Sequence, residues 1–413
     1  MSLPWISVAP LGASDFATLR RRAIFDCNKW DPQMEDESAI APHPLILHER
    51  AWRELSSASE RLAAETLAAE QELAERPELH AALGFPRAVR RALGEAQRHG
   101  PSRGIARLIR FDFHFTTDGW RISEANTDVP GGLNEASGFA GLFAPWYRSA
   151  VAVGDPVADY ADALLGRVEG GACIALVHAT AYTDDRQVMT YLARTLASRG
   201  ARAVLVSPAQ LSWSEGRASL ACEWAAGTVD AIVRFFPGEW LPNLAGRSGW
   251  QSFFAGARTP LSNPAVALLT QSKRFPLVWD ALRTPLPTWR ALLPETRDPR
   301  DCAWRESEGW VLKPALGRVG EDVGIREVIP PKEWRLLARS ARWRPRQWVA
   351  QRRFVAVPLE RDGTTAYPCV GVYTIDGRVA GAYGRLARRP LIDWRAQDMA
   401  VMRTVTTEAR AIA

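Results

Sequence analysis

Apolar residues recur with helical and then with strand-like spacing along the first third of the chain. Residues 46–98 are rich in Ala, Leu, Glu and Arg with apolar positions at helical spacing, and Pro77 and Pro86 interrupt them. This pattern predicts a helical N-terminal region. Residues 105–115 and 120–126 instead alternate apolar and polar positions around a Thr-Thr-Asp-Gly turn signal, which predicts a β-hairpin.

From about residue 172 the pattern becomes that of a βαβ unit. An apolar strand is expected at 173–178, a helix at 186–198 and a second strand at 203–206. A third apolar run at 231–236 is expected to join the same small parallel sheet, because strands separated by a helix are typically parallel.

The last third of the chain carries short apolar runs separated by Gly-rich or Arg-rich connections. Strands are expected at 310–314, 348–351 and 369–373. Helical segments, a hairpin and a βαβ unit together predict an α+β protein with α/β elements.

Composition narrows the class of protein. The 413 residues are 47% hydrophobic and 24% charged, which is typical of a globular protein. No stretch approaches the roughly 18 consecutive apolar residues of a membrane span, and the first residues lack the pattern of a secretory signal. We therefore expect a cytoplasmic protein without a membrane partner.

Neither the cysteines nor the net charge point to a special class. The five cysteines lie far apart without metal-ligand spacing, so we expect reduced thiols rather than disulfides or a zinc site. The net charge of +6 is spread thinly and no nucleic-acid-binding signature accompanies it. We therefore expect no nucleic-acid partner.

Lysine is rare in this chain. Of 52 basic residues only four are lysines, namely Lys29, Lys273, Lys313 and Lys332. A lysine kept in such an Arg-rich chain is a candidate for a place that needs a compact point charge.

The hairpin brings chemically suggestive side chains together. If residues 117–119 form a three-residue loop with the glycine in the left-handed conformation, Asp112 lies opposite Glu124 and Arg110 opposite Asn126. Alternation then places all four side chains on one face of the ribbon.

Two carboxylates and an amide oxygen on one face suit magnesium, which prefers oxygen ligands and is often completed by nucleotide phosphates. Arg110 beside them can hold a phosphoryl oxygen. The alternative is an ordinary exposed charged hairpin face. The chain after the hairpin favours a site, because a turn leads into a helix starting near Leu133, whose N-terminus can bind an anion.

A second segment has the character of a nucleotide site. The strand expected at 310–314 carries Lys313 and runs into a glycine loop at 317–320, where backbone amides and a lysine can meet phosphates. Alone, such a loop is an ordinary turn in most proteins. Lys273 precedes a buried-looking segment upstream, and Gln351 ends a strand that either meets an adenine edge or is a plain sheet strand.

These motifs together resemble the glutathionylspermidine synthase family, specifically its ATP-grasp synthetase part without an amidase domain. The strongest matches are Arg110-Phe-Asp-Phe113, Glu124-Ala-Asn-Thr-Asp-Val-Pro130 and Leu133-Asn-Glu-Ala136. Weaker matches follow in the family's order over about residues 100 to 390, namely 236–241, Ser272-Lys273, Lys313-Pro314 with Gly317-Arg318, Gln351 and 381–385.

The resemblance implies an ATP-grasp fold with a Rossmann-like pre-ATP-grasp domain. It also implies roles for individual residues. Asp112, Glu124 and Asn126 would bind magnesium, and Arg110 and Arg385 would contact the reacting group. The residues that would bind ATP are Lys273, Lys313, Gly317, Arg318, Gly320 and Gln351.

Three parts are expected on this basis. Residues 1–165 would form the helical N-terminal region with the hairpin, 166–265 the Rossmann-like domain and 266–413 the ATP-grasp nucleotide-binding domain. The implied activity is an ATP- and Mg²⁺-dependent ligase that joins a small-molecule or peptide carboxylate to an amine through an acyl phosphate.

Two departures from the family keep other activities open. The phosphate loop has Val319 where the family usually has Glu, and Leu386-Ala387 replaces a Glu-Asp pair after Arg385. The alternatives are a nucleotide-binding protein without ligase activity and a small-molecule kinase. The acid, the amine and the oligomeric state are left open by the sequence.

Overall fold

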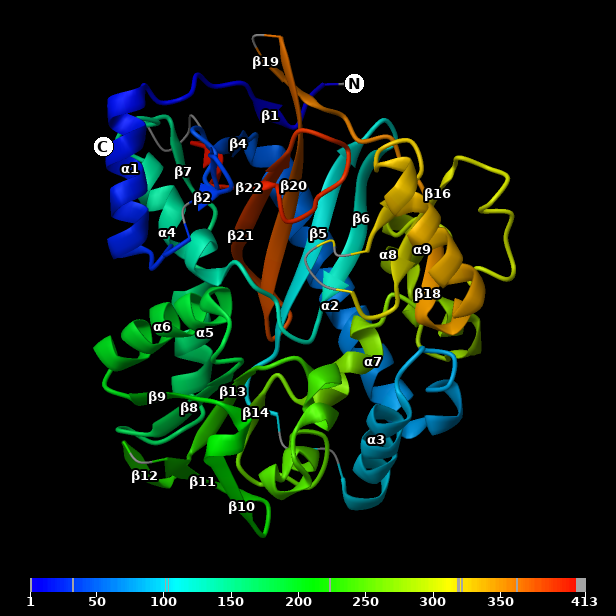
Figure 1. Cartoon of the computed structure of the whole chain (residues 1–413). Coiled ribbons are helices and arrows are strands. Elements are labelled where there is room, and N and C mark those ends of the chain that lie inside the picture. Colours follow the sequence, from blue (N-terminus) through cyan, green and yellow to red (C-terminus); the bar gives the residue numbers. More distant parts are fainter. Residues whose placement is uncertain are drawn as a thin grey trace.

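The computed structural model describes residues 2–405 apart from 32, 101, 103, 223, 318, 319, 321 and 362, and it leaves the side chains of 97–99 aside. The described strands form six sheets, and helices cover the larger ones (Figure 1). None of the described helices is long and apolar enough to cross a bilayer.

The largest sheet combines strands from both ends of the sequence. The hairpin pairs with the long C-terminal strands, because β5 (Leu108–Thr116) runs antiparallel to β20 (Thr364–Ile375). A β-sheet can join distant segments in this way, since its hydrogen bonds connect adjacent strands, which need not be close in sequence. The order is β22 (Gln397–Met399), β21 (Arg378–Ala387), β20 (Thr364–Ile375), β5 (Leu108–Thr116) and β6 (Gly119–Asn126), with β19 (Leu359–Arg361) beside β20.

The second sheet is the parallel sheet that the sequence predicts. Its strands and the helix α6 (Thr183–Ser198) confirm the βαβ unit, and their bounds differ from the prediction by only a few residues. The order is β14 (Leu261–Ser262), β13 (Ala231–Phe235), β8 (Cys173–His178) and β9 (Arg202–Val206). An antiparallel sheet that the sequence did not suggest follows β9, with β10 (Leu211–Ser214), β11 (Arg217–Cys222) and β12 (Ala225–Thr228).

The third sheet lies beside the hairpin. The helix α9 (Pro331–Trp343) packs on it through buried Leu337 and Ala341. The order is β15 (Thr296–Arg297), β18 (Trp348–Arg352), β16 (Trp310–Pro314) and β17 (Gly324–Ile325).

The N-terminal region is helical, as predicted, but includes elements that the pattern did not reveal. The long helix α2 (Glu49–Glu75) ends before a 3-10 turn at Pro77–Leu79, and α3 (Arg87–His99) begins after Pro86. Proline lacks the amide hydrogen that a helix interior needs, so both breaks fall where proline stands. The helix α1 (Ala13–Asp26) was missed, since it buries only Leu19 and Ala23.

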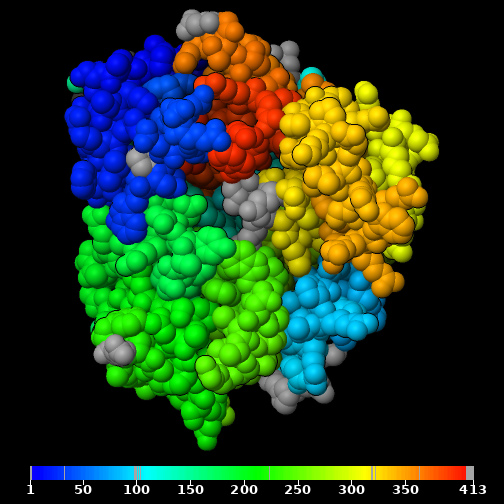
Figure 2. Space-filling model, viewed as in Figure 1, coloured from blue at the N-terminus to red at the C-terminus, as the bar shows by residue number. Residues whose placement is uncertain are grey.

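The two ends of the described chain meet in a small sheet. Figure 2 shows the first residues, in blue, packed against the C-terminal segment, in red. The strands are β1 (Trp5–Ile6), β4 (Leu45–Leu47), β23 (Val401–Thr404) and β7 (Ala150–Ala152), and β2 (Gln33–Met34) pairs with β3 (Glu37–Ser38). The remaining helices are α4 (Leu133–Phe143), α5 (Pro156–Leu165), α7 (Leu268–Gln271) and α8 (Pro287–Leu292).

Candidate active site

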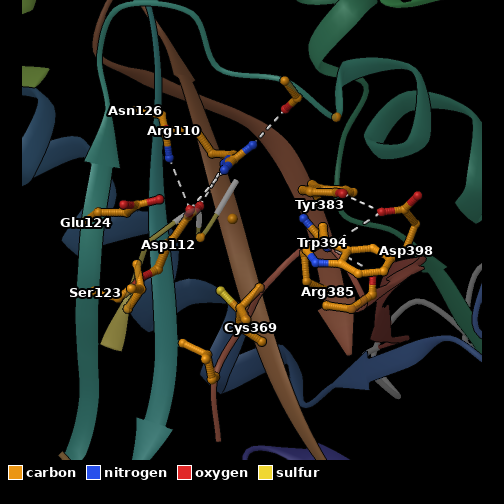
Figure 3. A pocket seen from close by; sticks show the side chains of 18 of the residues that line it. Arg110, Asp112, Ser123, Glu124, Asn126, Cys369, Tyr383, Arg385, Trp394 and Asp398 are labelled. Atoms are coloured by element: carbon orange, nitrogen blue, oxygen red, sulfur yellow. Dashed lines mark hydrogen bonds and ion pairs between the residues drawn. The ribbon is translucent and has the colours of Figure 1, made fainter. Parts of the chain in front are cut away.

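The open end of the hairpin carries the predicted pairs. Asp112 lies opposite Glu124 and Arg110 lies opposite Asn126, so the predicted register is confirmed here. All four side chains line one cavity. Figure 3 shows them projecting from β5 and β6 towards one another.

The turn of the hairpin is not the predicted one. Thr116 pairs with Gly119, which leaves a two-residue loop where we expected residues 117–119 to form a three-residue loop. Gly119 has the expected left-handed conformation, with φ of +87°. A two-residue loop alone would move the two carboxylates to opposite faces. A one-residue bulge at Ser123, which has no partner on β5, restores the register.

The cavity has a volume of about 680 Å³ and lies where the large sheet, the β16–β18 sheet and the loops after β8 and β13 meet. A volume of this size accommodates a nucleotide-sized ligand. Its lining includes every predicted site residue that the structure describes except Lys273 and Gly317, namely Arg110, Asp112, Glu124, Asn126, Lys313, Gly320, Gln351 and Arg385.

Asp112 is held from two sides. Nε and Nη2 of Arg110 donate to its two carboxylate oxygens at 2.7 and 2.9 Å, and Nδ2 of Asn126 donates to Oδ2 at 3.0 Å. Burial raises the pKa of Asp112, and the charge of Arg110 opposes this rise.

Arg110 is itself fixed in orientation. Its Nη1 donates to the carbonyl of Gly131 at 2.8 Å. Its guanidinium lies 6.0 Å from the ring centre of Tyr373 and 5.5 Å from that of Tyr383, which is the range of cation–π attraction. The hydroxyl of Tyr373 donates to the same Gly131 carbonyl. Such a constrained cation is preorganised for an incoming anion.

Glu124 faces the two lysines of the nucleotide segments. Nζ of Lys273 lies 3.1 Å from Glu124 Oε2 and donates to the carbonyl of Gly317 at 2.7 Å. Nζ of Lys313 donates to the carbonyl of Ser123 at 2.9 Å. Burial raises the pKa of Glu124, but the charges of Lys273 and Lys313 outweigh this effect and hold it at about 2. Glu124 is therefore a carboxylate at neutral pH.

Lys313 and Gln351 form one buried unit. Lys313 donates to Gln351 Oε1 at 2.7 Å, and Gln351 Nε2 donates to Thr296 Oγ1 at 3.1 Å. Burial lowers the pKa of Lys313 to about 8. The side chain of Gln351 thus orients a lysine, while its predicted place at an adenine edge stays a prediction.

Part of the predicted phosphate loop lies outside the described residues, Arg318 included. Gly320 lines the cavity with φ of +69°. A Cβ there would lie 2.3 Å from the carbonyl oxygen of Ile392. Only glycine fits this position, for reasons of both conformation and space.

Arg385 reaches the cavity from β21. Its Nη2 donates to the carbonyl of Asp393 at 2.7 Å and to that of Ala396 at 3.1 Å. Its Nε lies 3.7 Å from Asp398 Oδ1. Figure 3 shows it apart from the cluster around Asp112, near Trp394.

A second charged cluster in the same cavity was not predicted from the sequence. Nζ of Lys29, which is 5% exposed, lies 2.8 Å from Asp398, 3.0 Å from Glu135 and 3.2 Å from Asp31. Tyr383 links this cluster to Arg110, since its hydroxyl donates to Asp398. The rarity of lysine was a signal for Lys29, but its carboxylates come from separate segments and share no motif.

The donors on the hairpin suit magnesium. Among the described residues, no group of three or more His, Cys, Asp or Glu side chains is placed to hold a metal ion. Binding of Mg²⁺ here therefore needs the carboxylates of Asp112 and Glu124, the amide oxygen of Asn126 and further oxygens from a ligand. That is the partial protein shell that Mg²⁺ commonly takes with nucleotides.

A family model described as "Glutathionylspermidine synthase preATP-grasp" matches residues 29–399. The chain belongs to this family. Membership confirms the resemblance inferred from the hairpin motifs and, with the observed sheets, the predicted α+β fold of the ATP-grasp type with a Rossmann-like pre-ATP-grasp part. Membership of this family also indicates an amide-bond ligase. No curated protein matches the sequence.

Two solved structures resemble the chain distantly. A putative gamma-glutamylcysteine synthetase from Methylobacillus flagellatus KT is 12% identical with a TM-score of 0.44, over 84% of this chain and 87% of its own. D-alanyl-alanine synthetase A from Vibrio cholerae O1 biovar eltor str. N16961 is 10% identical with a TM-score of 0.30, over 57% of this chain and 89% of its own.

Proposed function

We propose that this family member is an ATP- and Mg²⁺-dependent carboxylate–amine ligase that forms an amide through an acyl phosphate. The observation that carries the proposal is the convergence of the hairpin donors with Arg110 and Lys313 around one cavity, together with the ion pair between Lys273 and Glu124. An anionic nucleotide needs such a combination of oxygen ligands and fixed cations.

Asp112, Glu124 and Asn126 would hold Mg²⁺ against the phosphates. The ion supplies charge neutralisation at the transferring phosphoryl group. The arginine contacts of Asp112 set the direction of its carboxylate. Glu124 is ionised because Lys273 and Lys313 stabilise its charge, so it needs no proton loss on binding.

Lys273 and Lys313 would bind the phosphates of ATP as point charges. Both are already held by backbone carbonyls, those of Gly317 and Ser123. Their positions therefore depend little on the ligand, which lowers the entropy cost of binding.

Arg110 would bind the oxygen that becomes negatively charged as the γ-phosphoryl group moves to the carboxylate. The amine then attacks the acyl carbon, a C–N bond forms, and phosphate leaves. Loss of one such preorganised donor commonly costs about 10²–10³ in rate. Arg385 lies on another side of the cavity and is proposed to meet the acyl group.

The proposal is tested by removing the carboxylates of the hairpin. Asp112→Ala and Glu124→Ala should each abolish ADP release from ATP while thermal unfolding stays cooperative. The matched control is Asp118→Ala, because Asp118 is an exposed carboxylate on the turn of the same hairpin. Undiminished ADP release from both cavity variants would contradict the assignment.

The three-part organisation with boundaries at 165/166 and 265/266 is also kept as a proposal. The pairing of β5 with β20 places strands from the first and third parts in one sheet. The site is accordingly proposed to be shared between these parts rather than contained in one.

A further inference from the structure

The outward face of α9 carries an unusual combination of side chains. Taking 100° per residue, it spans roughly 120° of the helix. Every residue on it is exposed. The members are four cations and two large apolar residues, namely Lys332, Arg335, Arg339, Arg342, Leu336 and Trp343. We call these six residues the α9 outer face.

The two apolar residues are not part of the core. Leu336 is 62% exposed and Trp343 is 72% exposed. They lie seven residues apart, which places them on the same side of the helix two turns from each other. The helix packs on its sheet through the opposite side, where Leu337 and Ala341 are buried. Folding therefore gives no reason for their apolar character.

The cations of the α9 outer face are free to bind another molecule. In the described part of the chain, no carboxylate forms an ion pair with them. Arg335 donates to the carbonyl of Pro331 at 3.2 Å, and Arg342 lies 5.7 Å from the ring centre of Trp343. Figure 1 shows α9 lying over the β16–β18 sheet, towards the right of the view.

We propose that the α9 outer face docks on the surface of an anionic phospholipid bilayer. The headgroup region accepts arginine, leucine and tryptophan together, because anionic phosphates lie there next to the acyl chains. A nucleic acid would bind the arginines, but it accepts a leucine only between unstacked bases, which costs a few kcal/mol. A protein partner would need a pocket shaped for both apolar side chains, whereas a bilayer needs none.

This proposal departs from the expectation of no membrane partner, which rested on the lack of a spanning segment. It concerns peripheral contact by side chains that are exposed on a folded helix. It is independent of the proposed ligase activity, since none of the six residues lines the cavity.

The test is sedimentation of the full-length protein with vesicles. Vesicles of equal parts phosphatidylcholine and phosphatidylglycerol should pellet the protein at low salt, and phosphatidylcholine alone should not. Reversing three charges, as Arg335→Glu with Arg339→Glu and Arg342→Glu, should weaken partitioning at least about a hundredfold. The double variant Leu336→Ser with Trp343→Ser should weaken it about tenfold with the charge unchanged.

A matched control reverses three exposed arginines elsewhere, as Arg87→Glu, Arg91→Glu and Arg217→Glu. It should retain most of the partitioning, and all variants should unfold at the wild-type temperature. The proposal is overturned if the wild-type protein does not pellet with anionic vesicles. It is also overturned if the control loses as much partitioning as the triple charge-reversal variant of the α9 outer face. Loss in the charge variant without loss in the apolar variant would also overturn it and favour a polyanion such as nucleic acid.

Discussion

The buried Lys313 should make nucleotide binding depend on pH in a window where most lysines stay charged. Burial lowers its pKa to about 8. Below that pH the ammonium attracts the phosphates of ATP, and above it the neutral amine does not. At about pH 9, roughly one molecule in ten keeps the proton, so the affinity for ATP should fall about tenfold, or about 1.4 kcal/mol.

The measurement is calorimetric titration of ATP with Mg²⁺ between about pH 7 and pH 9. Lys313→Arg keeps its charge throughout this range, so its affinity should stay flat with pH even if it is weaker overall. Lys332→Arg is the matched control, because that lysine is exposed on α9 and should leave the wild-type profile unchanged. A flat wild-type profile, or an equal fall in Lys313→Arg, would refute the reasoning.

Three further predictions concern the frame of the cavity. Asp128→Ala leaves the fully buried Arg234 without its ion-pair partner, and chemical denaturation should show a loss of about 3–5 kcal/mol, whereas near-wild-type stability would count against it. Gly132→Ala places a methyl group 2.9 Å from the Tyr383 ring at a residue with φ of +81°. It should lower the free energy of unfolding by at least about 1 kcal/mol, and an unchanged unfolding midpoint would contradict this. Burial raises the pKa of Cys369 well above its usual value, so this thiol should resist iodoacetamide at neutral pH until the protein unfolds. Peptide mass mapping can follow the labelling, and rapid labelling of the native protein would contradict this prediction.

The part of the site that could be predicted lies on one local element. Alternation of side chains along a strand fixes which residues share a face, so the Asp112–Glu124 pairing follows from residues a dozen positions apart. The bulge at Ser123 could not be predicted, because it reflects how β6 fits against β5 rather than any turn residue. Two opposite errors, a loop one residue too long and a missing bulge, cancel at the carboxylates.

The parts that escaped prediction depend on distant contacts. The joining of β5 to β20 brings together segments more than 250 residues apart in the sequence, and no local pattern encodes such a partner. The cluster around Lys29 has the same origin, since Glu135 and Asp398 reach it from α4 and β22. The helix α1 was missed because its buried stripe is reduced to Leu19 and Ala23.

The fate of the γ-phosphate distinguishes a ligase at the cavity of Asp112 and Glu124 from a kinase and from a protein that only binds nucleotide. ADP and inorganic phosphate should be measured together after incubation of wild type with ATP, Mg²⁺ and pooled peptide acids and amines. We predict equal amounts of ADP and inorganic phosphate, and we expect their release to require the acid and the amine together. ADP without inorganic phosphate would identify a kinase, and ATP binding without any ADP would identify a nucleotide-binding protein; either result would contradict this prediction.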